Sequence, residues 1–191
     1  MKIRLLAAAL VAASLSATAV AEPVTYTIDP SHTQIAFTYS HMGFSNITGR
    51  FDSTEGMLTY DPENPTASSI EITTQIASVS TGVAKLDEHL KNADFFDAGN
   101  FPTATFKSTK VEAAGEGKLS LTGDLTIHGV TVPTSFDVTI NKIGDHPMVG
   151  KPAAGFDATG SIDRVAFGID KYLQATGPAV HLAVTIEAIA Q

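Results

Sequence analysis

Apolar and polar side chains alternate along most of residues 24–190. The alternating stretches are rich in Thr, Val, Ile and Phe, and residues typical of turns separate them. A period of two residues predicts strands with one buried face and one face in water. Because each strand has a polar face, helices need not cover the sheet. We therefore expect an all-β, antiparallel barrel or sandwich.

The pattern predicts about eight or nine strands, joined mostly by hairpins. Gly49 and Gly56 interrupt one long stretch and indicate a bend or a bulge within it. The turn after that stretch is residues 61–65, which contain two prolines. The predicted strands are residues 24–28, 33–41, 48–60, 68–79, 103–111, 118–128, 131–143, 154–163 and 179–190.

One stretch, residues 84–92, departs from the alternation and predicts a short helix. Leu86 and Leu90 give it an apolar stripe, and Thr81 is a candidate cap. The loop that follows, residues 94–102, is aromatic. Its phenylalanines could gate one end of a barrel or pack as a loop core, and the sequence favours neither interpretation. These residues are Phe95, Phe96 and Phe101.

The first 21 residues have the three parts of a secretory signal peptide. Lys2 and Arg4 precede an apolar stretch at residues 5–15, and small residues follow at 19–21. We expect cleavage after Ala21, and a single mature domain of residues 22–191 in the periplasm or outside the cell. The alternative is a retained anchor, but the stretch is shorter than the roughly 20 residues that a membrane span needs. No later segment is apolar enough to cross a bilayer, so we expect a protein that is not membrane-embedded.

Charge and cysteine content exclude several classes of protein. Without the two basic residues of the signal, 10 basic and 20 acidic residues remain, a formal net charge of −10. An acidic chain without a basic run is a poor partner for nucleic acid, which we exclude. There is no cysteine, which rules out cysteine catalysis, cysteine-ligated zinc and iron–sulfur clusters.

The remaining polar residues give no catalytic or metal-binding motif. No two histidines have the spacing of a ligand pair, and we expect His128 and His181 to be exposed on polar strand faces. His41 continues an apolar phase and could point inward. The tetrapeptide 29–32 holds Asp, Ser and His, and we interpret it as a turn. From these residues we predict no catalytic residues, no metal and no cofactor.

The barrel interior is the remaining place for a function. An eight-stranded barrel is just wide enough to fill itself with side chains or to hold one small ligand. Large residues such as Phe37, Phe136 and Phe156 alternate with small ones that would leave room, and the residues alone leave both outcomes open. The small residues are Ala36, Gly49, Ala104, Ala158 and Gly160.

Motifs along the whole mature chain resemble the YceI-like family of bacterial periplasmic proteins. The family resemblance implies an extended, lipocalin-like antiparallel β-barrel with a short helix on one side. It also implies an elongated apolar interior that takes a polyisoprenoid or another long-chain amphiphile, no established catalysis, and often a homodimer. The motifs are residues 28–37 (IDPSHTQIAF), His41, Gly49-x-Phe51, residues 89–97 (HLKNADFFD), 101–106 (FPTATF), 123–133 (GDLTIHGVTVP) and Arg164-x-x-Phe167-Gly168.

We therefore predict a periplasmic carrier that holds an isoprenoid quinone, a polyprenyl phosphate or a similar amphiphile. Two alternatives are an enzyme acting on a quinone or acyl lipid in the cavity, and a stress-related structural protein with a filled core. Arg164 is a candidate partner for a phosphate headgroup, with a surface ion pair as the alternative. The predicted ligand-binding residues are Ile35, Phe37, Tyr39, Phe51, Ile70, Ile72, Leu121, Leu125, Phe136, Val138, Phe156, Arg164, Leu182 and Val184.

Overall fold

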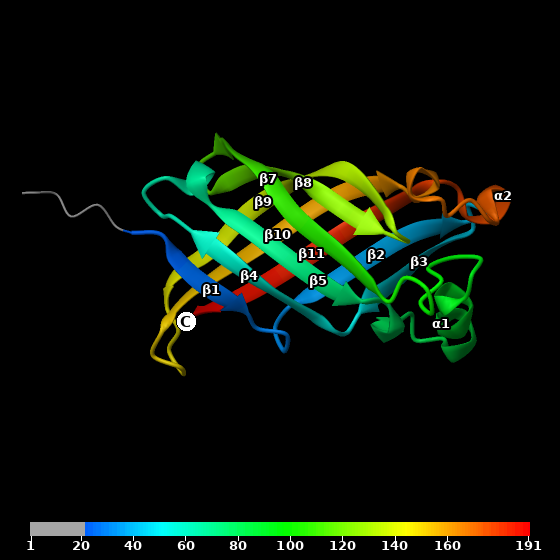
Figure 1. The fold of residues 1–191 in the computed structure, drawn as a ribbon, viewed down its shortest axis with the longest axis horizontal. Helices are drawn as coiled ribbons and strands as arrows, with labels where there is room; N and C mark the ends of the chain where they lie inside the picture. Colours follow the sequence, from blue (N-terminus) through cyan, green and yellow to red (C-terminus); the bar gives the residue numbers. More distant parts are fainter. Residues whose placement is uncertain (1–21) are drawn as a thin grey trace, which may run out of the picture.

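The computed structural model describes residues 22–191 and shows an elongated, closed antiparallel β-barrel (Figure 1). The proposed signal peptide, residues 1–21, lies outside the described residues. The strands are β1 (Val24–Ile28), β2 (Gln34–His41), β3 (Ser45–Phe51), β4 (Thr54–Tyr60), β5 (Ser69–Gln75), β6 (Val79–Ser80), β7 (Thr103–Gly115), β8 (Lys118–Ile127), β9 (Val130–Asp145), β10 (Pro152–Asp163) and β11 (Ala179–Ala190).

Eleven strands fill eight positions around the barrel, because three positions hold two strands in succession. β2 and β1 pair one after the other along β11. In the same way β3 and β4 pair with β2 and β1, and β6 and β5 pair with β3 and β4. The order around the barrel follows the chain, and the pairing of β1 with β11 closes it. This confirms the predicted antiparallel barrel of about eight strands.

The helices gather at one end of the barrel. Figure 1 shows α1 (Ala84–Lys91) and α2 (Leu173–Thr176) at the same end. Three short 3₁₀ turns complete the secondary structure, and none of the helices in residues 22–191 is long and apolar enough to span a bilayer. The turns are η1 (Pro65–Ala67), η2 (Ile76–Ser78) and η3 (Arg164–Phe167).

Helix α1 confirms the predicted helix to within one residue, but its start differs from the prediction. The N-cap residue is Val83, and its side chain makes no capping bond. The Thr81 hydroxyl instead donates to the Asp87 carboxylate at 2.6 Å and accepts a hydrogen bond from the Val83 backbone at 3.3 Å. Thr81 is therefore not the N-cap, but its hydroxyl stabilises the first turn of the helix from a position two residues before the N-cap.

Aromatic rings in the barrel interior lie over glycines on neighbouring strands. Phe37 covers Gly49 and Phe136 covers Gly160, and a Cβ atom at either glycine would collide with the ring. These glycines therefore make room for phenylalanines rather than for a ligand, which corrects the expectation from the sequence. Ala36 is also not inward, since its neighbours on both sides occupy the interior and successive strand residues face opposite sides.

Candidate functional site

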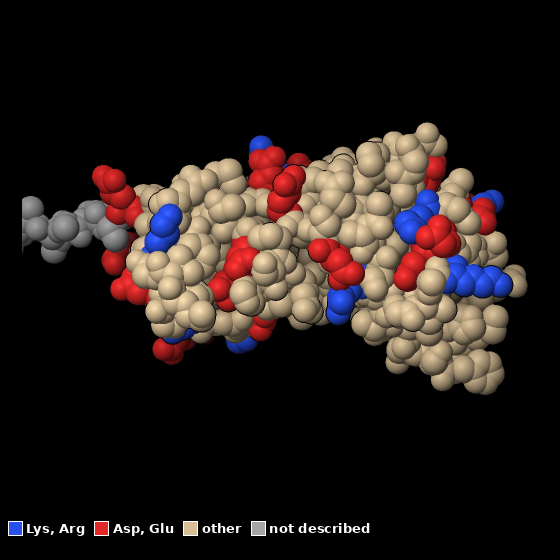
Figure 2. Space-filling model, turned by 90° about the horizontal axis from the view of Figure 1, so that it is seen from below, with Lys and Arg blue, Asp and Glu red and all other residues tan. Residues whose placement is uncertain are grey.

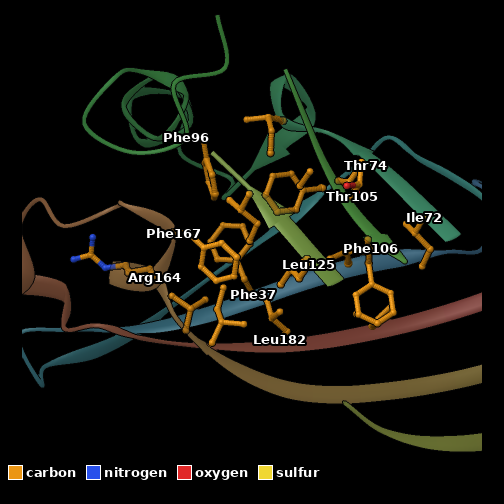
Figure 3. A pocket seen from close by; sticks show the side chains of 18 of the residues that line it. Phe37, Ile72, Thr74, Phe96, Thr105, Phe106, Leu125, Arg164, Phe167 and Leu182 are labelled. Carbon is orange, nitrogen blue, oxygen red and sulfur yellow. The ribbon is translucent and has the colours of Figure 1, made fainter. Parts of the chain in front are cut away.

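The barrel encloses an apolar cavity, which we call the central cavity. Its volume is about 170 Å³, and Figure 3 shows side chains from several strands converging on it. A second cavity of about 60 Å³ adjoins it, because four residues line both: Ile70, Leu121, Ala158 and Ile186. Well-packed interiors contain few voids larger than a water molecule, and apolar cavities of this size stay dry. The interior is therefore only partly filled, and the space in it suits an elongated apolar molecule.

The predicted lining residues do meet inside the barrel. Val138 and Phe156 line the second cavity. All the others line the central cavity: Ile35, Phe37, Tyr39, Phe51, Ile70, Ile72, Leu121, Leu125, Phe136, Arg164, Leu182 and Val184. The structure thus brings the whole predicted set together, while a ligand-binding role for each residue stays a prediction.

The sequence also expected Ala104 and Ala158 to face inward, and both line the central cavity. It missed other lining residues that alternation within a strand could have identified: Phe106, Ile127, Val180 and Ile186. Further missed residues lie in α1, in η3, just after η3 or in α2, where alternation carries no information: Leu90, Phe167, Ile169 and Thr176. The polar side chains of Thr74 and Thr105 also lie in the wall.

An aromatic cluster covers the central cavity at the end that carries α1 and α2. Phe95 and Phe96 both line the cavity. Phe96 meets Phe51 edge-on with ring centroids 5.6 Å apart, and Phe95 stacks on Tyr172 at 5.6 Å. His89 packs edge-on against both Phe95 and Tyr172. We call this end of the barrel the mouth.

The third phenylalanine of the aromatic loop lies elsewhere. Phe101 packs against the His128 ring, with centroids 4.6 Å apart, and its ring covers Gly129. His128 and Gly129 form the tight turn between β8 and β9, both with left-handed backbone (φ 53° and 74°). His128 is therefore half-buried, although the strand phase predicted exposure. Phe95 and Phe96 lie at the cavity, where a gating role stays a prediction, and Phe101 packs as part of a loop core.

Arg164 is buried, with 7% of its surface exposed, so the alternative of a surface ion pair is wrong. Its Nε donates to the Gly177 carbonyl at 2.8 Å and Nη1 to the Ile169 carbonyl at 2.9 Å. Its Nη2 donates to the Lys171 carbonyl at 2.7 Å and to the Thr176 hydroxyl at 2.8 Å. In Figure 3 the guanidinium points away from the aromatic side chains of the cavity. A headgroup would have to compete with these bonds, so a headgroup role stays a prediction.

Two ionisable side chains lie in the wall near the mouth. Burial raises the pKa of the Tyr39 hydroxyl, and the nearby Arg164 charge opposes that shift. Burial also lowers the pKa of Arg164, but a guanidinium stays protonated at neutral pH. Among residues 22–191, those that line the two cavities include no histidine and no carboxylate. His41, for which the strand phase allowed an inward position, is exposed at the end of β2.

One polar cluster on the barrel wall has the chemistry of a cation site. Ligand atoms of Asp29, His32 and Glu187 lie within 4.8 Å of one another. His32 Nδ1 bonds Asp29 Oδ2 at 2.7 Å, and Asp29 Oδ1 accepts from the Ser31 backbone in the predicted turn. His146 Nε2 contacts Glu187 Oε1 at 3.2 Å. The members of the cluster thus already bond one another and neighbouring residues of the wall. None of them lines either cavity.

Comparisons with known proteins agree with this geometry. The family model described as the YceI-like domain matches residues 26–188. The protein YceI of Escherichia coli O157:H7 is 38% identical over 168 residues, which cover 87% of each chain. The crystal structure of Campylobacter jejuni YCEI superposes with a TM-score of 0.71 at 30% identity, covering 78% of this chain and 87% of the other.

A more distant structure shares the fold. It is described as a polyisoprenoid binding domain from Saccharophagus degradans, and it superposes with a TM-score of 0.69 at 13% identity. The match covers 88% of this chain and 99% of that domain. At this identity the likeness shows the barrel architecture, which the two chains have in common.

Proposed function

The chain belongs to the YceI-like family, and from this premise we propose that it binds the hydrocarbon chain of an isoprenoid lipid inside the barrel. The observation that carries the proposal is the central cavity, which is apolar and continues into a second cavity. The domain from Saccharophagus degradans that shares the fold is described as binding a polyisoprenoid, which supports the same ligand class here. A bound isoprenoid quinone or polyprenyl phosphate fits this description.

Burial of apolar surface supplies enough free energy for such binding. An isoprenoid chain that buries roughly 500 Å² gains on the order of 12 kcal/mol, and association costs of about 4–15 kcal/mol offset much of it. Micromolar or tighter affinity then needs no strong polar contact. We propose binding rather than catalysis, since the residues of 22–191 that line the two cavities include no histidine or carboxylate, the usual general acids and bases. The ionisable side chains in these linings are Tyr39, Tyr60 and the already bonded Arg164.

The proposal also includes location and role. Residues 1–21 have the sequence of a cleaved signal peptide, and we propose that residues 22–191 act in the periplasm as a carrier of this lipid. Fractionation of cells, followed by N-terminal sequencing, tests export. A mature chain that starts at Glu22 supports it, and a full-length chain in the cytoplasm contradicts it.

The test of binding uses Ala158, a half-buried residue of β10 that lines both cavities. In Ala158→Phe, the new ring fills the junction between the cavities. We expect the affinity for a polyprenyl chain of eight or more units to fall at least about tenfold, because part of the chain loses its apolar contacts. A chain of two or three units should lose less, since it needs only the central cavity. Native mass spectrometry and competition with a fluorescent lipid measure both affinities.

The matched control is Ala183→Phe. Ala183 is an exposed residue of β11, the strand next to β10, and it lines neither cavity. The control should bind both lipids like the wild type. Equal losses for the two variants, or no binding of either lipid by the wild type, would count against the proposed function.

A further inference from the structure

Four large apolar side chains are exposed at the mouth of the barrel, and we call them the mouth rim. Phe44 is 89% exposed, Met42 58%, Tyr172 51% and Leu173 37%. They come from two segments, the β2–β3 hairpin and the loop that leads into α2. The two segments are adjacent, because the Met42 backbone N–H donates to the Ala175 carbonyl at 2.6 Å. Figure 1 shows both at the end of the barrel that carries α1.

The backbone holds these side chains outward. Met42 and Gly43 have left-handed backbone (φ 52° and 74°), and the Phe44 N–H closes the turn on the His41 carbonyl at 3.0 Å. In the other segment, the buried Arg164 guanidinium bonds carbonyls on both sides of Tyr172 and Leu173. The exposure therefore belongs to the ordered fold, and two fixed loops present one apolar surface.

The mouth rim is continuous with the central cavity. Tyr172 stacks on Phe95 with an interplanar angle of 12°, and Phe95 is part of the cavity wall. Thr176, one turn after Tyr172, also lines the cavity. An apolar molecule that leaves the cavity past these rings would emerge directly at the mouth rim.

Charge does not explain this surface. The predicted mature chain carries a formal net charge of −10, which opposes attraction to an anionic surface. On the face shown in Figure 2, basic and acidic side chains are interspersed, including at the end that carries α1 and α2. Attachment through the mouth rim would therefore rest on the insertion of apolar side chains.

We propose that the mouth rim docks on the surface of a phospholipid membrane, so that the mouth of the cavity faces the acyl chains. The inference deepens the proposed function and rests on it, since an isoprenoid ligand resides in membranes. Phe44 and Met42 enter the interface first because they are the most exposed of the four side chains. Docking needs no anionic lipid, and it persists at high salt, because insertion of apolar groups is not screened.

The chain contains no tryptophan, so the fluorescence of a single introduced tryptophan reports on the surroundings of that position alone. Phe44→Trp places the reporter in the mouth rim. Met148→Trp is the matched control, since Met148 is 90% exposed and lies in the β9–β10 loop at the other end of the barrel. On addition of phosphatidylcholine vesicles, we expect the emission of Phe44→Trp to shift to the blue and to be quenched by brominated acyl chains. Met148→Trp should keep its emission.

A second variant measures the contribution of the aromatic ring. Phe44→Ser should weaken vesicle binding roughly tenfold in a flotation assay, since the inserted phenylalanine ring gains free energy from leaving water. Its affinity for a short isoprenoid in solution should match that of the wild type, because Phe44 does not line the cavity. This second assay separates failure of docking from failure of lipid binding.

Several outcomes would overturn the inference. Equal shifts of both reporters, or no shift of either, would show that the mouth rim does not insert. Insertion only into vesicles with anionic lipid, lost at high salt, would assign attachment to charge. A blue shift of Phe44→Trp without vesicles, together with a doubled mass in sedimentation, would make the surface a contact between two copies of this chain. If short isoprenoids bind but neither reporter shifts, the proposed function stands and membrane docking is wrong. If Phe44→Trp inserts into vesicles but no isoprenoid binds, the proposed function is wrong although the mouth rim does meet the membrane.

Discussion

At the scale of single residues, Arg164 shows how one side chain fixes the mouth. Its guanidinium bonds three carbonyls and one hydroxyl, and it forms no direct ion pair within the described residues. In Arg164→Met, the stem still fills the cavity wall but the carbonyls lose their donors. Buried groups left without partners cost about 1–3 kcal/mol each, so we expect the free energy of unfolding to fall by roughly 3 kcal/mol or more. Urea unfolding measures it.

The control for this change is the other arginine among residues 22–191. Arg50 is about half exposed and pairs with Asp52 at 2.6 Å. Surface pairs of this kind contribute about 0–1 kcal/mol, so Arg50→Met should be nearly neutral. A loss in Arg164→Met no larger than this would show that the guanidinium does not organise the loop.

The two arginines also show what a sequence can reveal about a site. The predicted lining residues lie in strands, where one correct phase assigns every second side chain to the interior. The surroundings of Arg164 come from carbonyls in an irregular loop, to which residue type is nearly irrelevant. The sequence therefore predicted that Arg164 lies near the mouth of the barrel, beside the Phe167-Gly168 motif. It could not predict which groups its guanidinium bonds. For the same reason Phe37 and Gly49 were expected separately, while their contact depends on three-dimensional register.

At the scale of elements, the interruption between β1 and β2 leaves a gap beside β11 that side chains fill. The Thr33 hydroxyl exchanges hydrogen bonds of 3.3–3.4 Å with the backbone of Glu187, in place of a strand. On the outer side, His32 lies between the carboxylates of Asp29 and Glu187, and His146 approaches Glu187 from the β9–β10 loop. The cluster thus connects three segments where the wall has no continuous ladder.

This cluster predicts a pH dependence of stability. The hydrogen bond to Asp29, with its charge and that of Glu187, raises the pKa of His32 above 6.5. Its stabilisation is complete below about pH 6.5 and is lost as the pH rises through the raised pKa. The His32 hydrogen bond lowers the pKa of Asp29 below 3.8, so that contribution is lost only as the pH falls through the lowered pKa. The pair should stabilise the barrel most between about pH 4 and 6.5.

The measurement is the difference in Tm between the wild type and His32→Gln across pH 4–9. We expect the wild type to be more stable at pH 5.5, and the difference to shrink above the raised pKa. His181→Gln serves as control, because His181 is an exposed histidine of β11 that bonds Ser161. A difference that grows with pH, or that His181→Gln reproduces, would contradict the role of the cluster.

Elements were predictable where their signal is periodic. The ranges of β1 and β11 match the predicted strands because alternation persists to their ends. Residues 48–60 were expected as one bent strand, but β3 and β4 are separate because Asp52 and Ser53 leave the ladder and the two halves pair with different strands. Helix α2 has four residues, too few for a helical period to be visible.

At the scale of the whole molecule, we expect the proposed ligand to enter and leave past the aromatic cluster of the mouth, because Phe95 and Phe96 line the cavity there. Tyr172 joins the two loops that cover the cavity: its ring stacks on Phe95, and its hydroxyl donates to Asp94 at 3.2 Å. The residue also has a left-handed backbone (φ 57°), which is costly for a tyrosine and persists because its surroundings fix it. A contact between two loops lies outside the hydrogen-bonded strands of the barrel, and such contacts open at lower free energy than the strands do, so we expect the cavity to open here.

We predict that Tyr172→Ala speeds both the uptake and the release of a bound isoprenoid by about tenfold, because the stack contributes about 0.5–1.5 kcal/mol and its hydrogen bond adds to it. The equilibrium affinity should change little, since the cavity wall itself is unaltered and a gate acts on both rates. Tyr172→Phe keeps the stack and removes only the hydroxyl, so its uptake and release rates should lie between those of the wild type and those of Tyr172→Ala. Stopped-flow transfer of a fluorescent isoprenoid measures the rates. If Tyr172→Ala changes the affinity and leaves the release rate untouched, the ring is part of the binding wall rather than a gate, and lipid must enter by another route.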